Sequence, residues 1–114
     1  MVGAELTAAV MHDGTPVVCV RGELDMLAAP GLARALSRAT GKRCRNVVLD
    51  LSESTFIDST ILGVILGFAR KLENHGCGFV VVTKRPHVTR VLELTGLARV
   101  FPVVGSRHEA LAVL

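Results

Sequence analysis

The residues best placed to do chemistry are two adjacent hydroxyls, Ser59 and Thr60, which directly follow Asp58. The stretch after them, Ile61 to Ala69, is almost entirely apolar and predicts a helix that begins at Asp58 or Ser59. The first turn of a helix carries unpaired backbone N–H groups and the positive end of the helix dipole. A phosphate on Ser59 would lie in a favourable field, so we predict that this serine is a switch.

The helix expected from Ser59 to about Asn74 divides into two faces when residues are placed 100° apart. One line should face a sheet: Ile61, Ile65, Phe68 and Leu72. The opposite side carries Ser59, Gly63 and Gly67, with Leu62 and Leu66 on the shoulder beside Ser59. Each glycine costs about 1 kcal/mol relative to alanine, so a reason for both is needed. Two reasons stay open: close packing on a neighbouring helix of the domain, or close approach of a partner protein.

Several carboxylates are expected around the start of this helix: Glu23, Asp25, Asp50, Glu53 and Asp58. Hard oxygen ligands suit magnesium, so one interpretation is a magnesium site for phosphoryl transfer. We favour a structural interpretation, in which Asp58 caps the helix, Asp25 braces a loop and Glu53 is solvated. Since the sequence has no GK[ST] loop to hold phosphates, we expect no metal and no cofactor.

The histidines and cysteines form no recognisable catalytic or metal-binding pattern. The histidines occur in turns or at helix ends, where we expect them on the surface: His12, His75, His87 and His108. Three cysteines without CxxC spacing argue against a disulfide framework, and we expect Cys19 and Cys77 to be core thiols in a reducing cytoplasm. Because no nucleophile has an evident triad, we predict a regulatory binding module and not an enzyme.

Size and composition are those of one globular domain spanning residues 1–114, half of which are hydrophobic. The net charge of +3 comes from scattered basic clusters without Trp or Tyr, so we expect no direct nucleic-acid binding. The first eleven residues do not resemble a signal peptide, and the longest charge-free run is short of the roughly 20 residues of a membrane helix. We therefore expect a cytoplasmic protein without membrane insertion.

The order of expected elements predicts an α/β fold. Two strands, Glu5–Met11 and Pro16–Arg21, form a hairpin through Asp13 and Gly14. Helices and strands then alternate: a helix from Pro30 to about Thr40, a strand over Asn46–Leu51, a loop over Ser52–Ile57, the helix at Ser59, a strand over Phe79–Thr83, a helix from Pro86 to Gly96, an edge strand over Val100–Val104 and a last helix capped by Ser106. This predicts a mixed sheet with about four helices, mainly covering one face.

Four segments together resemble the STAS family, the domain shared by sulphate transporters and bacterial anti-sigma factor antagonists. The segments are Gly22-Glu23-Leu24-Asp25, Val48-Leu49-Asp50-Leu51, Phe56-Ile57-Asp58-Ser59-Thr60 with Leu62-Gly63, and Val91-Leu92-Glu93-Leu94-Thr95-Gly96-Leu97. They extend over nearly the whole chain. The resemblance implies a STAS-like fold.

In antagonists of this type, the resemblance implies that a partner phosphorylates the serine of a D-S-[ST] motif, which Ser59 matches; we favour it over Thr60. The partner is an anti-sigma factor with serine kinase activity. The unphosphorylated antagonist binds it and frees the sigma factor, and a protein phosphatase later resets the phosphorylated form. The expected partner-binding residues are Asp25, Asp58, Ser59, Thr60, Leu62, Gly63 and Leu66.

Alternatives remain beside this hypothesis. STAS domains also serve transporters, so the chain could be an accessory or regulatory subunit of a membrane transport complex. A third hypothesis is an enzyme or nucleotide-binding domain that uses the carboxylate cluster with magnesium. Ile61 departs from the family pattern, in which a glycine often follows the two hydroxyls. A β-branched residue there could stiffen the first turn or narrow the partner's approach. Pairing of two copies through the hairpin edge, as a homodimer, also stays open.

Overall fold

A mixed sheet of six strands forms the centre of the computed structural model, which describes residues 5–6 and 10–114. The strands are β1 (Glu5–Leu6), β2 (Val10–His12), β3 (Thr15–Leu24), β4 (Val47–Ile57), β5 (Phe79–Val82) and β6 (Val103–Val104). The order across the sheet is β1-β3-β4-β5-β6, with β2 also paired to β3. β1 and β2 run antiparallel to β3, whereas β3 to β6 are parallel. The predicted mixed sheet opened by a hairpin is confirmed.

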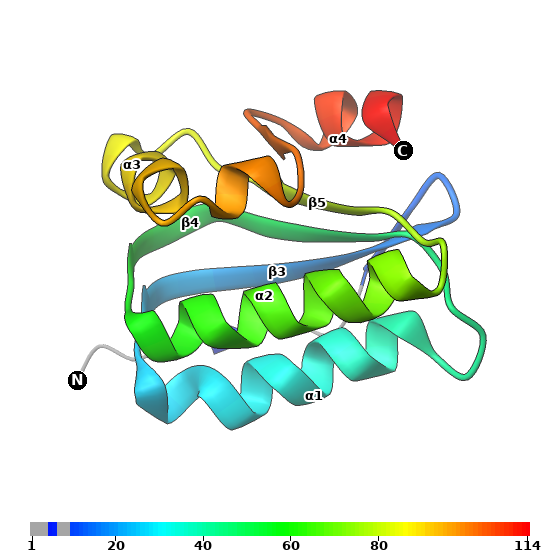
Figure 1. The fold of residues 1–114 in the computed structure, drawn as a ribbon, viewed down its shortest axis with the longest axis horizontal. Coiled ribbons are helices and arrows are strands. Elements are labelled where there is room, and N and C mark those ends of the chain that lie inside the picture. Colours follow the sequence, from blue (N-terminus) through cyan, green and yellow to red (C-terminus); the bar gives the residue numbers. More distant parts are fainter. Residues whose placement is uncertain (1–4, 7–9) are drawn as a thin grey trace.

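Helices cover both faces of this sheet unequally. They are α1 (Ala29–Thr40), α2 (Ser59–Asn74), α3 (Pro86–Leu94) and α4 (Arg107–Val113), with short 3-10 helices η1 (Met26–Ala28) and η2 (Leu97–Arg99). Figure 1 shows α1 and α2 side by side along one face, while α4 lies across the sheet from them. Val88 and Leu92 of α3 join the same core as α1 and α2, so the helices mainly cover one face, as predicted. No helix in the described ranges is long and apolar enough to cross a membrane.

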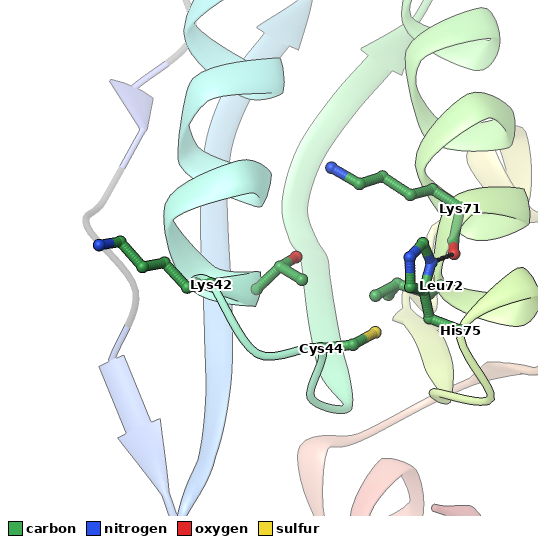
Figure 2. A pocket seen from close by; sticks show the side chains of 7 residues that line it. Lys42, Cys44, Lys71, Leu72 and His75 are labelled. Atoms are coloured by element: carbon green, nitrogen blue, oxygen red, sulfur yellow. Dashed lines mark hydrogen bonds between the residues drawn. The ribbon is translucent and has the colours of Figure 1, made fainter.

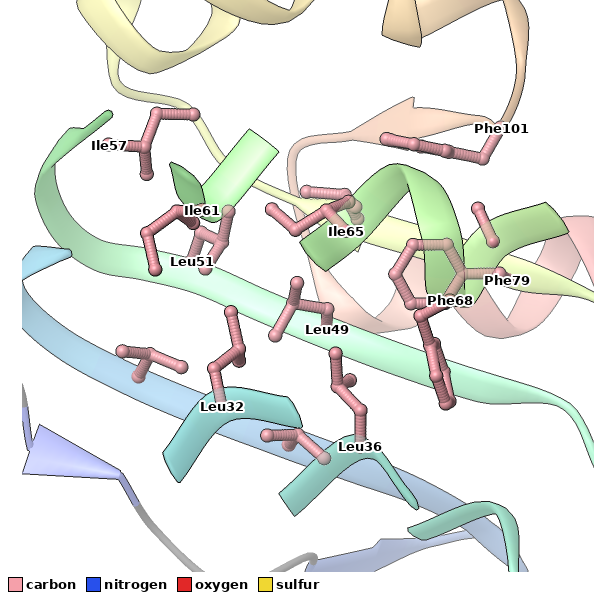
Figure 3. Packing of buried hydrophobic residues seen from close by; sticks show 14 of the residues in the cluster. Leu32, Leu36, Leu49, Leu51, Ile57, Ile61, Ile65, Phe68, Phe79 and Phe101 are labelled. Carbon is pink, nitrogen blue, oxygen red and sulfur yellow. The ribbon is translucent and has the colours of Figure 1, made fainter. Parts of the chain in front are cut away.

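The main hydrophobic core lies between β4 and the helix pair α1–α2 (Figure 3). The predicted apolar line of α2 is buried throughout: Ile61, Ile65, Phe68 and Leu72. It packs with leucines from α1 and β4, namely Leu32, Leu36, Leu49 and Leu51. A smaller core on the other face joins Ala110 of α4 to valines of three strands. The sheet is therefore buried on both sides, which explains the apolar runs in its parallel strands.

The opening hairpin turns through Asp13 and Gly14, whose φ values are 49° and 80°. Two successive positive φ values match the right-handed twist of the paired strands, and Asp-Gly is the pair that tolerates them. The hairpin prediction is confirmed where the first strand is described. Residues 7–9 of the predicted strand Glu5–Met11 lie outside the described residues.

The predicted loop over Ser52–Ile57 is wrong, because β4 continues through it to Ile57. β3 also extends, to Leu24, and pairs with this segment through two register shifts near Gly22, whose φ is 87°. The buried Ser54 donates its hydroxyl to the Val20 carbonyl at 3.2 Å. Pairing with β3 thus provides hydrogen-bond partners for a hydroxyl-rich segment. From its composition alone, this segment is predicted to be a loop.

The prediction that Cys77 is a core thiol is also wrong. Cys77, in the loop after α2, is paired with Cys44, in the loop after α1, as a disulfide with a Cα–Cα distance of 6.4 Å. Cys19 is the remaining cysteine, and it lies half-buried in β3. The two paired residues are 33 positions apart, so their proximity follows from the packing of α1 against α2 and has no local sequence signal.

Candidate functional site

The start of α2 is built around Asp58. The Asp58 side chain accepts a hydrogen bond from the Ile61 N–H at 2.9 Å, which makes it the N-cap that the sequence predicted. The Asp58 N–H donates to the Leu24 carbonyl at 3.1 Å and ties the helix start to the end of β3. Two of the four N–H groups at the N-terminus of α2 thus donate hydrogen bonds, and the other two belong to Ser59 and Thr60. Both of these hydroxyl residues are exposed.

Asp25 lies beside this helix start, in the turn that follows β3. Its carboxylate accepts a hydrogen bond from the Leu27 N–H at 3.0 Å and caps η1, so the predicted loop-bracing role is confirmed. η1 in turn contacts α2. The structure therefore brings Asp25 to the same end of the molecule as Asp58 and Ser59.

The outer side of α2 continues the surface away from Ser59. Leu62 and Leu66 are partly buried against the main core, as expected for shoulder residues. Gly63 and Gly67 are exposed, and a Cβ built on either would meet no atom of the described structure within 4 Å. Both line an open groove of about 270 Å³ between α1 and α2. Close packing on a neighbouring helix therefore does not explain these glycines.

Ile61 does not face this surface. Its side chain is fully buried in the main core, and only its backbone N–H takes part in the helix cap. The concern that Ile61 narrows a partner's approach is wrong, because the side chain points into the core beneath the helix. A β-branched residue at this position serves packing against β4.

Asp50 does not lie at the N-terminus of α2. The prediction that it belongs to the carboxylates around the start of this helix is wrong. With β4 extended to Ile57, Asp50 lies roughly 25 Å along the strand from Asp58. Its carboxylate accepts hydrogen bonds from Arg107 Nε at 2.7 Å and from the Ser52 hydroxyl at 2.5 Å. Arg107 also contacts the Cys19 sulphur. This cluster holds α4 against the sheet and is separate from Ser59.

The protonation states of this cluster follow from burial and from its charged hydrogen bonds. Burial raises the pKa of Asp50, but hydrogen bonds from Ser52 and Arg107 outweigh it, and the pKa lies below its ordinary value. Burial, followed by the Asp50 charge, raises the pKa of the Cys19 thiol. Cys19 therefore stays a protonated thiol at neutral pH.

The remaining predicted polar residues are dispersed. Glu23 and Glu53 are exposed, and Glu53 is solvated as predicted. Within residues 5–6 and 10–114 no group of three His, Cys, Asp or Glu side chains is placed to hold a metal ion. Three histidines are exposed and His12 is half-buried; His87 stacks on Phe56 with ring centroids 6.2 Å apart.

Sequence reasoning missed exposed apolar side chains near Ser59. Leu27 and Met26 of η1 are 86% and 66% exposed, directly after Asp25. Phe56, two residues before Asp58, is 41% exposed. The sequence does show that these large apolar residues lie beside the two capping aspartates. It does not show whether they are buried or exposed. Exposed apolar groups around a polar centre are typical of a protein-binding surface.

Comparisons with known proteins agree with this architecture. The anti-sigma F factor antagonist of Paenibacillus polymyxa is 33% identical over 104 residues, which cover 90% of this chain and 89% of that protein. The crystal structure of an anti-sigma factor antagonist from Mycobacterium paratuberculosis superposes with a TM-score of 0.88 at 33% identity, covering 97% of this chain and 93% of that one.

A more distant structure shares the fold. The Bacillus cell fate determinant SpoIIAA in its phosphorylated form has a TM-score of 0.70 at 22% identity and covers 96% of this chain and 97% of that one. The family model described as the STAS domain matches residues 7–110. The chain belongs to the STAS domain family.

Proposed function

We propose that this protein is an anti-sigma factor antagonist that is controlled by phosphorylation of Ser59. The observation that carries the proposal is an exposed hydroxyl in the first turn of α2, beside a largely apolar surface. Two relatives that are each 33% identical over most of the chain carry the name anti-sigma factor antagonist. Both support an anti-sigma factor as the partner of this chain.

The proposed partner surface combines η1 with the start and outer side of α2. It consists of Asp25, Asp58, Ser59, Thr60, Leu62, Gly63 and Leu66, extended by the exposed Met26 and Leu27. Asp58 and Asp25 engage their carboxylates in capping bonds, so apolar contacts dominate the rest of this surface. The proposed partner is an anti-sigma factor with serine kinase activity, in the cytoplasm, and a protein phosphatase restores the binding form.

A phosphate on Ser59 would oppose this binding for two physical reasons. It adds about −1.5 to −2 charges next to the Asp58 carboxylate, and it must lose water when the apolar surface is covered. A difference of about 3 kcal/mol between the two forms would change partner affinity more than a hundredfold. The helix N-terminus meanwhile stabilises the phosphate on the free protein. Both effects favour dissociation of the modified form.

The experiment mixes the purified chain with an anti-sigma factor kinase encoded in the same genome and with ATP, and locates the modification by mass spectrometry. We expect one phosphate on Ser59, no phosphate on Ser59→Ala, and normal modification of the matched control Thr60→Ala. Binding is measured by calorimetry before and after modification. Phosphate on Thr60 alone, or equal affinity of both forms, would contradict the proposal. Copurification with a membrane permease, unaffected by Ser59→Ala, would instead favour the transport subunit.

A further inference from the structure

Two loops at the far end of α2 bring a pair of cysteines together. Residues 41–46 follow α1 and contain Cys44, while residues 75–78 follow α2 and contain Cys77. Their Cα atoms are 6.4 Å apart, within the range that a disulfide bridges without backbone movement. Both residues are half-buried and are partly packed on the main core. The positions of the two loops therefore suit a disulfide between Cys44 and Cys77.

A small basic pocket opens beside this pair. It has a volume of about 120 Å³ and is lined by Thr40, Gly41, Lys42, Cys44, Lys71, Leu72 and His75. Figure 2 shows Cys44 between the lysine of the α1 loop and the two basic residues at the end of α2. Such a pocket admits a molecule of the size of hydrogen peroxide. Lys42 and Lys71 give the lining of this pocket a positive charge, and positive surroundings favour the thiolate, which is the nucleophilic form of cysteine.

We propose that Cys44 and Cys77 form a reversible disulfide in response to hydroperoxides. The pair lies at the C-terminal end of α2, a helix of 16 residues and about 24 Å, so it is remote from Ser59. The bond joins the two loops and thereby holds α1 to α2. In the reducing cytoplasm proposed above for this protein, a disulfide is typically transient and redox-sensing. This inference is independent of the proposed partner switch.

The chemistry balances with a hydroperoxide as the oxidant. The thiolate of one cysteine attacks the peroxide, its sulphur gains OH, the O–O bond breaks, and the leaving oxygen takes a proton. The second thiol then attacks the sulfenic sulphur, so that the S–S bond forms and the S–O bond breaks. The departing hydroxide takes the second proton as water. The two sulphurs supply two electrons, which reduce the peroxide.

The expected physical effect is a large gain in thermal stability. The bond closes a loop with a sequence separation of 33, and loop closure of this length restricts the unfolded chain. For a domain of this size we expect the melting temperature to rise by about 10 °C on oxidation. Cys19 is the matched control, because it lies on the other face of the sheet with Asp50 and Arg107.

The test treats the whole chain with hydrogen peroxide, alkylates the remaining thiols and identifies the linked peptides by mass spectrometry. We expect a Cys44–Cys77 linkage, its loss on addition of dithiothreitol, and the melting shift in wild type and Cys19→Ser but not in Cys44→Ser or Cys77→Ser. Oxidation of Cys44 to a sulfinic acid without pairing, or pairing without a melting shift, would overturn the proposal. Ser59 phosphorylation is assayed separately on Cys44→Ser, so failure of the partner switch is distinguishable.

Discussion

Asp58, the residue before Ser59, fixes the position of the proposed phosphorylation site. Asp58 supplies the helix cap through its side chain and the link to β3 through its N–H. The hydroxyl of Ser59 is therefore held at the mouth of a helix whose first turn is fixed. The same carboxylate opposes a phosphate by charge, so Asp58 has both a structural and an electrostatic effect on this site.

Two replacements of Asp58 test its structural effect. Asp58→Ala removes the cap and is expected to lower the free energy of unfolding by about 1 kcal/mol, whereas Asp58→Asn keeps a side-chain oxygen as acceptor and should stay near wild type. Urea denaturation of both variants measures the difference. Equal stability of the two variants would show that the cap contributes nothing.

At the scale of elements, α2 presents small residues where α1 does not touch them. Gly63 and Gly67 line the open groove, and a Cβ on either would lie in free space among the described residues. A helix normally gains from alanine at such positions. Gly63, which belongs to the proposed partner surface, is therefore consistent with close approach of a second protein, one of the two explanations that the sequence allows.

Gly63→Ala and Gly67→Ala test this interpretation together. Each is expected to raise the free energy of unfolding by about 0.5–1 kcal/mol, since alanine restricts the unfolded chain and fits the helix. Gly63→Ala is also expected to weaken partner binding about tenfold, while Gly67→Ala, one turn farther from Ser59, is the matched control that retains binding. Stability is measured in urea and affinity by calorimetry. Unchanged affinity in both variants would contradict a role of Gly63 in the approach of a partner.

Elements with a local signal were predicted well, and those determined by distant partners were not. The periodic apolar line of α2 and the capping Asp58 lie within one segment, so the sequence indicated both. The second half of β4 depends on Gly22 and its neighbours in β3, and the Cys44–Cys77 pair depends on helix packing. For the candidate site, the sequence indicated Asp25, Ser59 and the leucine shoulder but not the exposure of Leu27. Exposure is a property of the assembled fold.

At the scale of the whole molecule, one ionic cluster connects the last helix to the middle of the sheet. Arg107 reaches Asp50 from α4, whose N-terminus is capped by the Ser106 hydroxyl accepting from the Glu109 N–H at 3.1 Å. The cap by Ser106 that the sequence predicted is confirmed, and the Glu109 carboxylate also accepts a hydrogen bond from the Gly105 N–H at 2.8 Å. The smaller core under α4 is sparse, so this cluster matters for the position of the helix.

Acid should weaken this connection. The pKa of Asp50 is lowered in the folded protein, so its contribution is fully present above the unfolded pKa near 3.8 and is lost as pH falls through the lower folded pKa. Arg107 is partly exposed, so we expect Arg107→Ala to cost only about 1–2 kcal/mol at neutral pH. The difference in the free energy of unfolding between wild type and Arg107→Ala should decrease in acid. Urea denaturation across pH measures it, with the exposed Arg90→Ala as control; a gap that does not depend on pH would contradict the assignment.

The hydrogen bond from the Asp58 N–H to the Leu24 carbonyl has a further consequence for recognition. It joins a turn near residue 25 to a helix that begins at residue 59, and neither segment alone carries the whole proposed surface. The surface is a conformational epitope, so no linear peptide of this chain would reproduce it. A partner that contacts both segments would distinguish folded copies from unfolded ones, and newly made chains would enter the regulatory cycle only after β3 and β4 have paired.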